Sequence, residues 1–464
     1  MAFAFFIVYL VLTYLHPGQI VPALAPYKVT YWIGMSGLVV AIGSLFGKRA
    51  GLAANLQLWL LLVFTAVMTL SLMLAEHWMG APLLILERFG PSLTMFVLAM
   101  CSVTSLARLR VTAGCVIVLT TALMLQGAAA YHFGYNTRMF LLDRTAGESA
   151  DLGADGLWDD GSRDDDAAAF ESAHIGSDDR GDGDDGAPRE IPRIRALGFM
   201  HDPNDLAVGM IVALGLIGGA WRPSWKLQHV LLAAAAGALV YGIYLTRSRG
   251  GALALVVVVW RFAARRIGPV PALALLLLLG AGVVAQDFGG RSLSTELDES
   301  ASERVVAWTE GFEMLKMQPV LGVGYGRFVD FHTLTAHNSL VLCFAETGLV
   351  GCFFWVGLVV ITLLELQGLK VLPASDTFDE GAGQYAEALQ LALIGFLTAA
   401  FFLSRTFVPT LYLIVGLSAA LAAIVRDEGT TISLPALPEL GMLVLVCEIG
   451  GIAVVYTMVK LHVA

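Results

Sequence analysis

Four short polar stretches of this sequence carry arginines or a histidine between long apolar runs. They contain Arg193 with Arg195, Arg247 with Arg249, Arg304, and His337 with Asn338. Guanidinium forks bind phosphate oxygens through paired hydrogen bonds, so several of them together favour a multiply charged anion. A neutral imidazole can accept a proton from a hydroxyl. If the four stretches meet in space, they predict an anion site beside a base.

The elements that must position these residues are membrane helices. The 464-residue chain is 57% hydrophobic and 14% charged, whereas about a quarter of a soluble domain is charged. We therefore predict an all-α polytopic membrane protein with about 12–13 transmembrane helices. The run 2–16 lacks the basic start and cleavage site of a signal peptide, so it is interpreted as the first span. The expected spans lie near 2–16, 29–46, 56–75, 85–106 (broken at Pro91), 111–131, 204–221, 227–245, 251–264, 268–286, 339–365, 386–403, 407–425 and 437–459.

Basic residues in the short loops predict the orientation. Lys and Arg recur in alternate short loops, at 48–49, 108–110, 222–226 and 261–266. Such loops face the cytoplasm, which places the N-terminus there and the four polar stretches on the outer face. Arginine on the outer face runs against this bias. The plain explanation is that these side chains snorkel towards lipid headgroups, and the functional one is anion binding.

The spans divide one membrane domain, 1–464, into five parts. These are five N-terminal spans (1–131), an acidic outer loop (132–203), four spans (204–286), an outer catalytic segment (287–338) and the C-terminal spans (339–464). Residues 143–190 hold 16 acidic and four basic residues, so the net charge of −10 comes from this loop. Because it is poor in apolar residues, residues 143–190 are predicted to be disordered. No window in it fits a calcium-binding loop.

Segment 287–338 should contain an amphipathic helix at the outer membrane surface. Apolar residues recur at 305, 308, 312 and 315, with charges on the opposite face, which is helical spacing. Ser302 would cap this helix and Pro319 would end it. The glycines of "GVGYG" that follow favour a flexible turn that re-enters the membrane surface. A dinucleotide fingerprint is rejected because no strand–helix unit surrounds them, and the charged helix before them argues against a potassium filter.

Part of the polarity has a structural explanation. Asp202 can cap a helix that begins at Pro203, and Asn338 can cap the helix that follows it. His337 would then lie at a positive helix end, which favours a neutral imidazole. Glu346 lies about two turns inside that helix and needs a partner there. Arginines or backbone amides of neighbouring elements are expected, and a structural ion pair is the simpler interpretation of this residue.

Together these residues predict a glycosyl transfer that needs no metal. A multiply charged anion presented at the outer membrane surface is most simply a lipid diphosphate. Arginines would stabilise the departing diphosphate while a base takes the proton of an acceptor hydroxyl. No metal ion, other cofactor or nucleic acid is expected. The catalytic candidates are His337, Arg195 and Arg249, and the substrate-binding candidates are Arg304, Asn338, Arg247, Arg193 and Glu346.

The sequence resembles the bacterial O-antigen ligase and O-antigen polymerase family. The matching stretches are "RALGFMHDPNDLA", "TRSRGGALAL", "ERVVAW", "QPVLGVGYGRF" and "HNSLVLCFAETGLVG", in this order between residues 195 and 351. The resemblance implies a GT-C-type helical fold with an outer catalytic cavity, and undecaprenyl-diphosphate-linked glycans as donors, with neither metal nor nucleotide. Arg195 and Arg249 match arginines thought to hold the diphosphate, His337 matches the proposed base, and Arg304 matches a further motif arginine. Arg193 and Arg247 have no firm counterpart.

The resemblance leaves the acceptor open. A lipid A-core sugar (ligase), the growing glycan (polymerase) or a protein side chain (protein O-glycosylation ligase) would each suit the motifs, and we favour the first. The expected location is the bacterial inner membrane, with the site facing the periplasm. A transporter of lipid-linked sugars and an ion channel are the rival functions, and neither needs His337 as a base. The long acidic insertion and a final span near 437–459 depart from the family pattern.

Overall fold

The computed structural model describes residues 1–45, 55–142, 192–220, 226–285, 296–371 and 380–463. Within these ranges the regular structure is almost entirely helical, and the one sheet has two strands, β1 (Leu141–Leu142) and β2 (Arg193–Ile194). The prediction of an all-α polytopic membrane protein is therefore confirmed.

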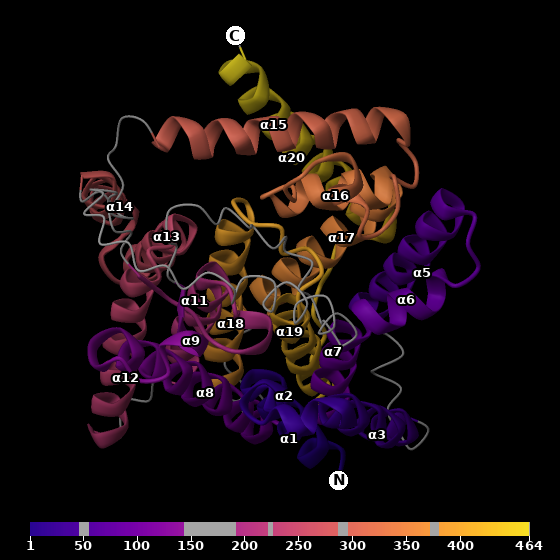
Figure 1. Cartoon of the computed structure of the whole chain (residues 1–464). Coiled ribbons are helices and arrows are strands. Elements are labelled where there is room, and N and C mark those ends of the chain that lie inside the picture. Colours follow the sequence, from indigo (N-terminus) through magenta and orange to yellow (C-terminus); the bar gives the residue numbers. More distant parts are fainter. Residues whose placement is uncertain (46–54, 143–191, 221–225, 286–295, 372–379, 464) are drawn as a thin grey trace.

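The helices follow the chain order shown in Figure 1. They are α1 (Ala2–Leu15), α2 (Pro17–Ile20), η1 (Pro22–Tyr27), α3 (Val29–Leu45), α5 (Leu56–Glu76), α6 (Ala81–Arg88), α7 (Gly90–Ser102), α8 (Leu106–Phe133), α9 (Thr137–Phe140), η2 (Gly198–Met200), α11 (Pro203–Ala220), α12 (Lys226–Thr246), α13 (Arg249–Ile267), α14 (Pro269–Ala285), α15 (Glu296–Met317), α16 (Phe328–Phe331), α17 (Ser339–Val371), α18 (Glu380–Ala400), α19 (Pro409–Asp427) and α20 (Leu437–Val463).

Every predicted apolar run coincides with a helix of the described chain. Six helices are long and apolar enough to cross a membrane, or up to seven if α6 and α7 form one broken span. This is fewer than the predicted spans, partly because α1, α3 and α14 are only 14, 17 and 17 residues long. The helices α6 and α7 meet at an angle of 59°. Pro91 lies in the first turn of α7, as the sequence predicts, because proline fits a helix start but not its interior.

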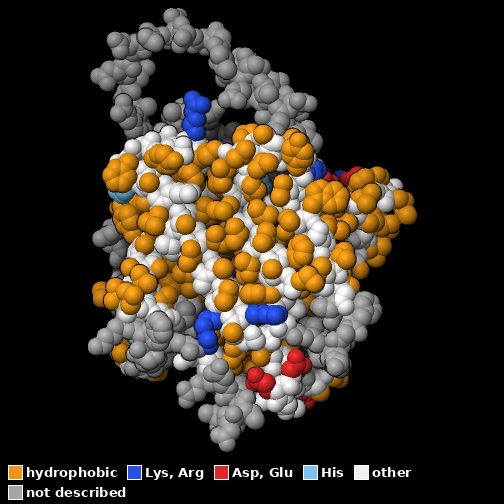
Figure 2. Space-filling view, turned by 90° about the horizontal axis from the view of Figure 1, so that it is seen from below, with side chains coloured by type: hydrophobic (Ala, Val, Ile, Leu, Met, Phe, Trp, Pro, Cys, Tyr) orange, Lys and Arg blue, Asp and Glu red, His pale blue; other side chains and the backbone are white. Residues whose placement is uncertain are grey.

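One face of the molecule is an apolar band. Figure 2 shows apolar side chains over the middle of this face, while the visible charged side chains lie towards its upper and lower margins. Exposed apolar residues of the protein include Val39 of α3 and Val118 of α8, which are 70% and 66% exposed. Lipid tails accept such a surface, which water would not.

The centre of the bundle is α19, in which every residue from Pro409 to Val425 is buried. It packs against α7, α17 and α18, and α18 packs in turn along α11 and α13. An ion pair between Arg426 and the buried Glu365 ties the end of α19 to α17. The turn between α18 and α19 is therefore held by the most buried helix of the described chain.

Helix α17 is interrupted, which the sequence did not predict. Gly348 has φ 65° and ψ −173° inside it. The segment 319–324 pairs with the break. The amides of Val323 and Gly324 donate to the carbonyls of Ala345 and Glu346, at 2.9 and 3.1 Å. The broken helix therefore keeps backbone partners, which buried polar groups require.

The predicted amphipathic helix of segment 287–338 is present as α15. Trp308 and Phe312 are 4% and 8% exposed and face the rest of the protein, and α15 packs on α17 and α20. Figure 1 shows α15 lengthwise along one edge of the molecule. The prediction that Ser302 caps it is wrong, because the helix begins at Glu296. The predicted end before Pro319 is confirmed.

The two ends of the acidic loop lie side by side. Leu141 and Leu142 pair with Ile194 and Arg193 in the antiparallel sheet of β1 and β2. The loop therefore leaves and returns at one place, next to the start of α11. The predicted disorder of 143–190 lies outside the described residues.

Candidate functional site

The turn 401–408, between α18 and α19, joins the elements that carry the predicted site residues. Ser339, the first residue of α17, donates a hydrogen bond through Oγ to the Leu403 carbonyl at 2.6 Å. The same Oγ accepts from the Arg405 amide at 2.7 Å. Thr406 Oγ1 donates to the Ser339 carbonyl at 2.6 Å. The start of α17, and hence His337 and Asn338, is thus fixed to this turn.

The start of α11 is attached to the same turn by a buried ion pair. The Arg405 guanidinium binds both carboxylate oxygens of Asp205, with Nη2 to Oδ2 at 3.0 Å. Their side chains are 9% and 12% exposed. Asp202 caps α11 as predicted, accepting from the Asn204 amide at 2.6 Å. Burial would raise the pKa of Asp202, but the cations of Arg405 and Arg193 outweigh it and the pKa is lowered.

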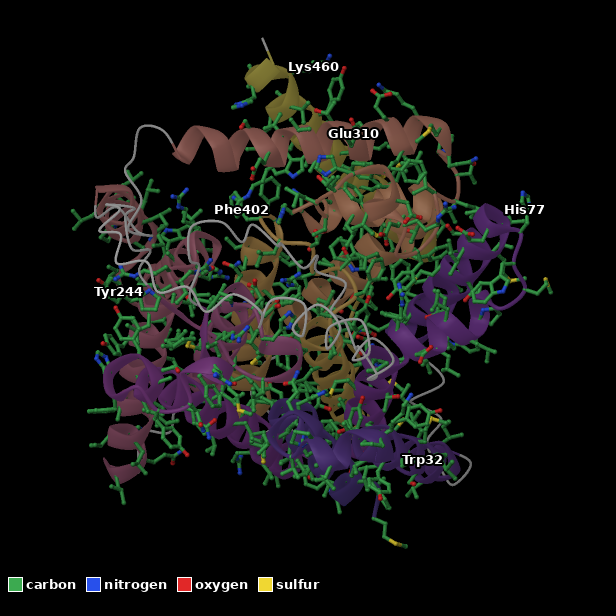
Figure 3. The ribbon with its side chains drawn as sticks, viewed as in Figure 1. Trp32, His77, Tyr244, Glu310, Phe402 and Lys460 are labelled. Atoms are coloured by element: carbon green, nitrogen blue, oxygen red, sulfur yellow. The ribbon has the colours of Figure 1, made fainter. Side chains whose placement is uncertain are left out.

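Arg249 and Arg304 lie beside this turn, close enough for their charges to interact. Arg249 is the first residue of α13, whose cap is Ser248. Trp308, one helical turn after Arg304, packs its ring 5.9 Å from that of Phe401. Burial lowers the pKa of Arg304, and the charge of Arg249 lowers it further. Two guanidinium groups in such proximity repel each other unless an anion lies between them. Figure 3 labels Phe402, the next residue of the turn, below α15.

Arg193 and Arg195 lie on and after β2, at the base of the acidic loop. Arg193 Nε donates to the Thr246 carbonyl at 2.8 Å, and its Nη2 donates to Asn204 Oδ1 at 3.3 Å. It thus braces the end of α12 against the start of α11. Arg195 Nη2 donates to the Arg138 carbonyl at 2.6 Å. Burial lowers the pKa of Arg195, and Asp202 partly offsets this.

Arg247 lies at the predicted outward turn between α12 and α13. Its backbone is left-handed, with φ 52°, and its guanidinium lies 4.3 Å from the centre of the Tyr244 ring. Tyr244 is labelled in Figure 3 on the outer side of α12.

Several of these side chains have unused donors. Arg195 Nε, Arg247 Nε and Asn338 Nδ2 are buried and have no hydrogen-bond partner among the described residues. Within the same residues, Arg249 and Arg304 make neither a hydrogen bond nor an ion pair. A buried donor without a partner costs about 1–3 kcal/mol. Several unpaired donors in one region are typical of a site that binds a ligand with many hydrogen-bond acceptors.

His337 precedes the cap of α17, as the sequence predicts. Asn338 Oδ1 accepts from the amides of Leu340 and Val341 at 2.9 and 3.1 Å. His337 itself is half-buried and left-handed, with φ 48°. A left-handed backbone costs a non-glycine residue about 1 kcal/mol or more. The strain turns the chain sharply just before the helix, where the turn 401–408 packs.

Comparison with family models decides the identity of this region. Residues 233–356 match the family described as O-antigen ligase. This region is therefore similar to the O-antigen ligase family. The match includes Arg249, Arg304 and His337, whereas Arg193 and Arg195 precede it. A comparison with curated proteins found no match. The family supports a membrane glycosyltransferase of the ligase or polymerase type.

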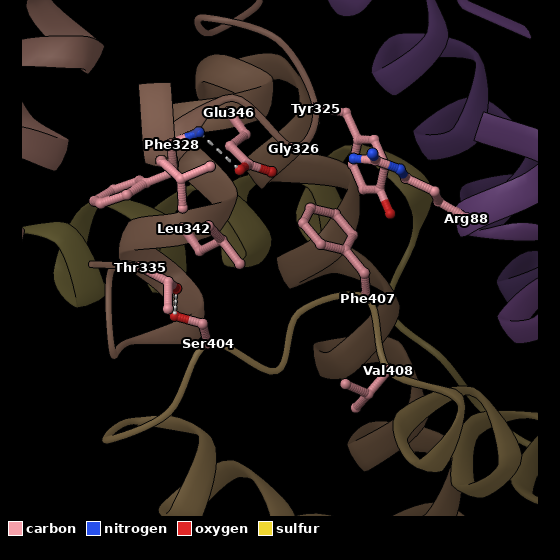
Figure 4. A pocket seen from close by; sticks show the side chains of 11 residues that line it. Arg88, Tyr325, Gly326, Phe328, Thr335, Leu342, Glu346, Ser404, Phe407 and Val408 are labelled. Carbon is pink, nitrogen blue, oxygen red and sulfur yellow. Dashed lines mark hydrogen bonds between the residues drawn. The ribbon is translucent and has the colours of Figure 1, made fainter. Parts of the chain in front are cut away.

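Glu346, within the matched region, lines a cleft that none of the predicted site arginines lines, shown in Figure 4. Its carboxylate accepts from the Phe328 amide at 3.2 Å, so one of its partners is a backbone amide, as expected. The cleft encloses about 550 Å³, including space open to solvent, and its lining includes Arg88, Tyr325, Thr335, Ser404 and Phe407. It borders the His337 segment through Thr335.

Sequence reasoning missed two arginines of this region. The pairing of Arg405 with Asp205 could not be predicted, because the two residues are 200 positions apart. Arg88 falls inside an apolar run, next to the Pro91 break, and yet lines the cleft. A charge within a predicted span was the available signal for Arg88, since such residues usually face the interior of a bundle.

Proposed function

We propose that this protein transfers a glycan from a polyprenyl diphosphate, specifically undecaprenyl diphosphate, to an acceptor hydroxyl. One observation carries the proposal. The start of α17, which follows the strained His337, and the start of α11 are both bonded to the turn 401–408, and Trp308 of the Arg304 helix packs on Phe401 of the same turn. Arginines of the neighbouring stretches have donors without a partner in the described chain. A diphosphate matches these donors in charge and in number of acceptor oxygens.

Arg249 and Arg304 stabilise the departing diphosphate. Negative charge develops on the diphosphate oxygen as its bond to the anomeric carbon breaks, and preformed donors lower the energy of that state. Arg249 lies at the N-terminus of α13, where the helix dipole adds to its charge. Arg195 contributes a third guanidinium. Arg193 positions the strand, because two of its donors are already used within the protein.

His337 activates the acceptor. Its imidazole takes the proton of the acceptor hydroxyl as the oxygen forms a bond to the anomeric carbon. The Asn338 amide nitrogen, which is buried without a partner in the described chain, donates to a substrate oxygen nearby. The arginines supply the positive charge at the leaving group, so the reaction requires no metal ion.

The acceptor that we propose is a lipid A-core sugar. The protein then lies in the inner membrane, with its site facing the periplasm and its N-terminus in the cytoplasm. Deletion of the gene should then cause full-length glycans to accumulate on the carrier. Accumulation of single repeat units would identify a polymerase instead. Transfer to a protein substrate would identify a protein O-glycosylation ligase.

The test is reconstitution of the full chain with purified lipid-linked glycan and a core-oligosaccharide acceptor. His337→Ala should abolish transfer at unchanged protein level, whereas His462→Ala, at the exposed end of α20, should not. Arg249→Lys should also be impaired, because an ammonium cannot form the bidentate fork. Arg327→Lys is the matched control, since Arg327 pairs with Glu76 and Asp330. Normal transfer by His337→Ala would refute the role of His337 as the base, and absence of transfer by the wild type would favour a transporter.

A further inference from the structure

The cleft around Glu346 shares a wall with the segment that carries His337. Thr335 Oγ1 and Ser404 Oγ are hydrogen-bonded to each other, and both residues line the cleft. His337 follows Thr335 by two residues, and Arg405 follows Ser404 directly. A molecule in the cleft therefore lies next to the His337 segment, and none of the arginines proposed to bind the diphosphate lines the cleft.

The lining of the cleft suits a sugar. Tyr325 and Phe407 form an edge-to-face aromatic pair with centroids 4.8 Å apart, which supplies an apolar surface. Glu346 is 3% exposed, and an ionised carboxylate accepts hydrogen bonds from hydroxyl groups. An apolar wall with a few fixed polar groups is the usual composition of a small-molecule site.

Arg88 indicates that the ligand of this cleft carries a negative charge. Figure 4 shows its side chain extending from α6 towards the cleft. It is half-buried, and within the described chain it makes neither a hydrogen bond nor an ion pair. The neighbouring Arg327 is paired, with its Nε 2.8 Å from Glu76 and 2.9 Å from Asp330. A half-buried guanidinium without a counter-ion at the edge of a cleft favours a phosphate or a carboxylate.

We propose that this cleft binds the acceptor and that the acceptor is an acidic sugar, bearing a phosphate or a carboxylate that Arg88 holds. The proposal rests on the glycan transfer proposed above. Glu346 accepts from hydroxyl groups of the bound sugar, and Tyr325 and Phe407 pack against its carbon skeleton. The sugar hydroxyl nearest Thr335 then faces the His337 segment, where the transfer takes place.

Kinetics of the full chain test this inference. Arg88→Gln should raise the KM for an acidic acceptor about 10- to 100-fold, the effect of losing one charge-assisted hydrogen bond, and leave the KM for the lipid-linked donor unchanged. Arg327→Gln is the matched control and should leave both KM values within about twofold. Arg88→Lys should recover part of the affinity, which loss of fold would not allow.

Inhibition by free sugars separates the two acidic groups. Glucose 6-phosphate, glucuronate and neutral glucose are each tested as inhibitors of transfer by the wild type and by Arg88→Gln. At least one acidic sugar should compete with the acceptor, more tightly than glucose, and lose this advantage in Arg88→Gln. The more potent of the two identifies phosphate or carboxylate. Equal potency of all three sugars, or competition with the donor instead, would overturn the inference. Absence of any transfer by the wild type would instead refute the proposed function itself.

Discussion

Removing Arg405 and removing Asp205 from their ion pair should lower the unfolding free energy of the protein by different amounts. Both side chains are almost buried, and the guanidinium binds both carboxylate oxygens. Removing one partner of such a pair costs about 3–5 kcal/mol, because the other charge is left buried and unpaired. The surroundings of the two residues decide which removal costs more.

Arg405→Gln removes the cation that both Asp205 and Asp202 depend on. Arg405 pairs with Asp205 and is also the cation that lowers the pKa of Asp202 most. We expect this variant to lose about 3–5 kcal/mol of unfolding free energy. Asp205→Asn leaves Arg405 with the nearby Asp202 and with its hydrogen bond to the Ser404 carbonyl at 3.0 Å. We expect it to lose only about 1–3 kcal/mol. The double variant should cost less than the sum of the two by about 0.5–3 kcal/mol.

Unfolding of the purified protein in mixed micelles with increasing SDS, followed by circular dichroism, measures these differences. Lys316→Gln is the control, since its pair with Glu313 is 65% and 51% exposed and should contribute less than about 1 kcal/mol. A larger loss in Asp205→Asn than in Arg405→Gln would refute the reasoning. Additive losses in the double variant would also refute it, because they would show that the two side chains do not interact.

Three further predictions concern other parts of the molecule. Gly322→Ala and Gly348→Ala should each destabilise the protein by about 2–4 kcal/mol in the same SDS unfolding assay. The new Cβ at position 322 would lie 2.4 Å from the carbonyl carbon of Glu346, and the one at position 348 would lie 2.3 Å from that of Val320. The control is Gly114→Ala, whose Cβ meets no atom within 4 Å, and an equally small effect in all three variants would contradict the prediction. Burial lowers the pKa of His16, so the unfolded state takes up its proton first and the thermal midpoint should fall as pH drops below about 6.5; His16→Asn should flatten this dependence, and an unchanged slope would contradict it. Transfer should persist in excess chelator, and a strict requirement for added divalent cation would exclude the metal-free mechanism.

The helices of this protein were predictable because their signal is local. An apolar run long enough to span lipid must bury its backbone polar groups within itself, so each run became a helix regardless of its neighbours. The caps at Asp202 and Asn338 follow from the same short-range logic. The polar stretches at Arg249, Arg304 and His337 were also visible, because charge beside apolar sequence requires an explanation.

The packing of the elements around the turn 401–408 depends on contacts between distant residues. Arg405 binds Asp205 across 200 positions, and Ser339 binds Leu403 across 64. No periodicity or spacing encodes such a pairing, because it results from how α18 and α19 pack against α11 and α17. The break at Gly348 and the separate position of Glu346 have the same origin. Local residue types decide which segments become helices and which side chains can bind an anion, whereas only packing decides which of them face the same ligand.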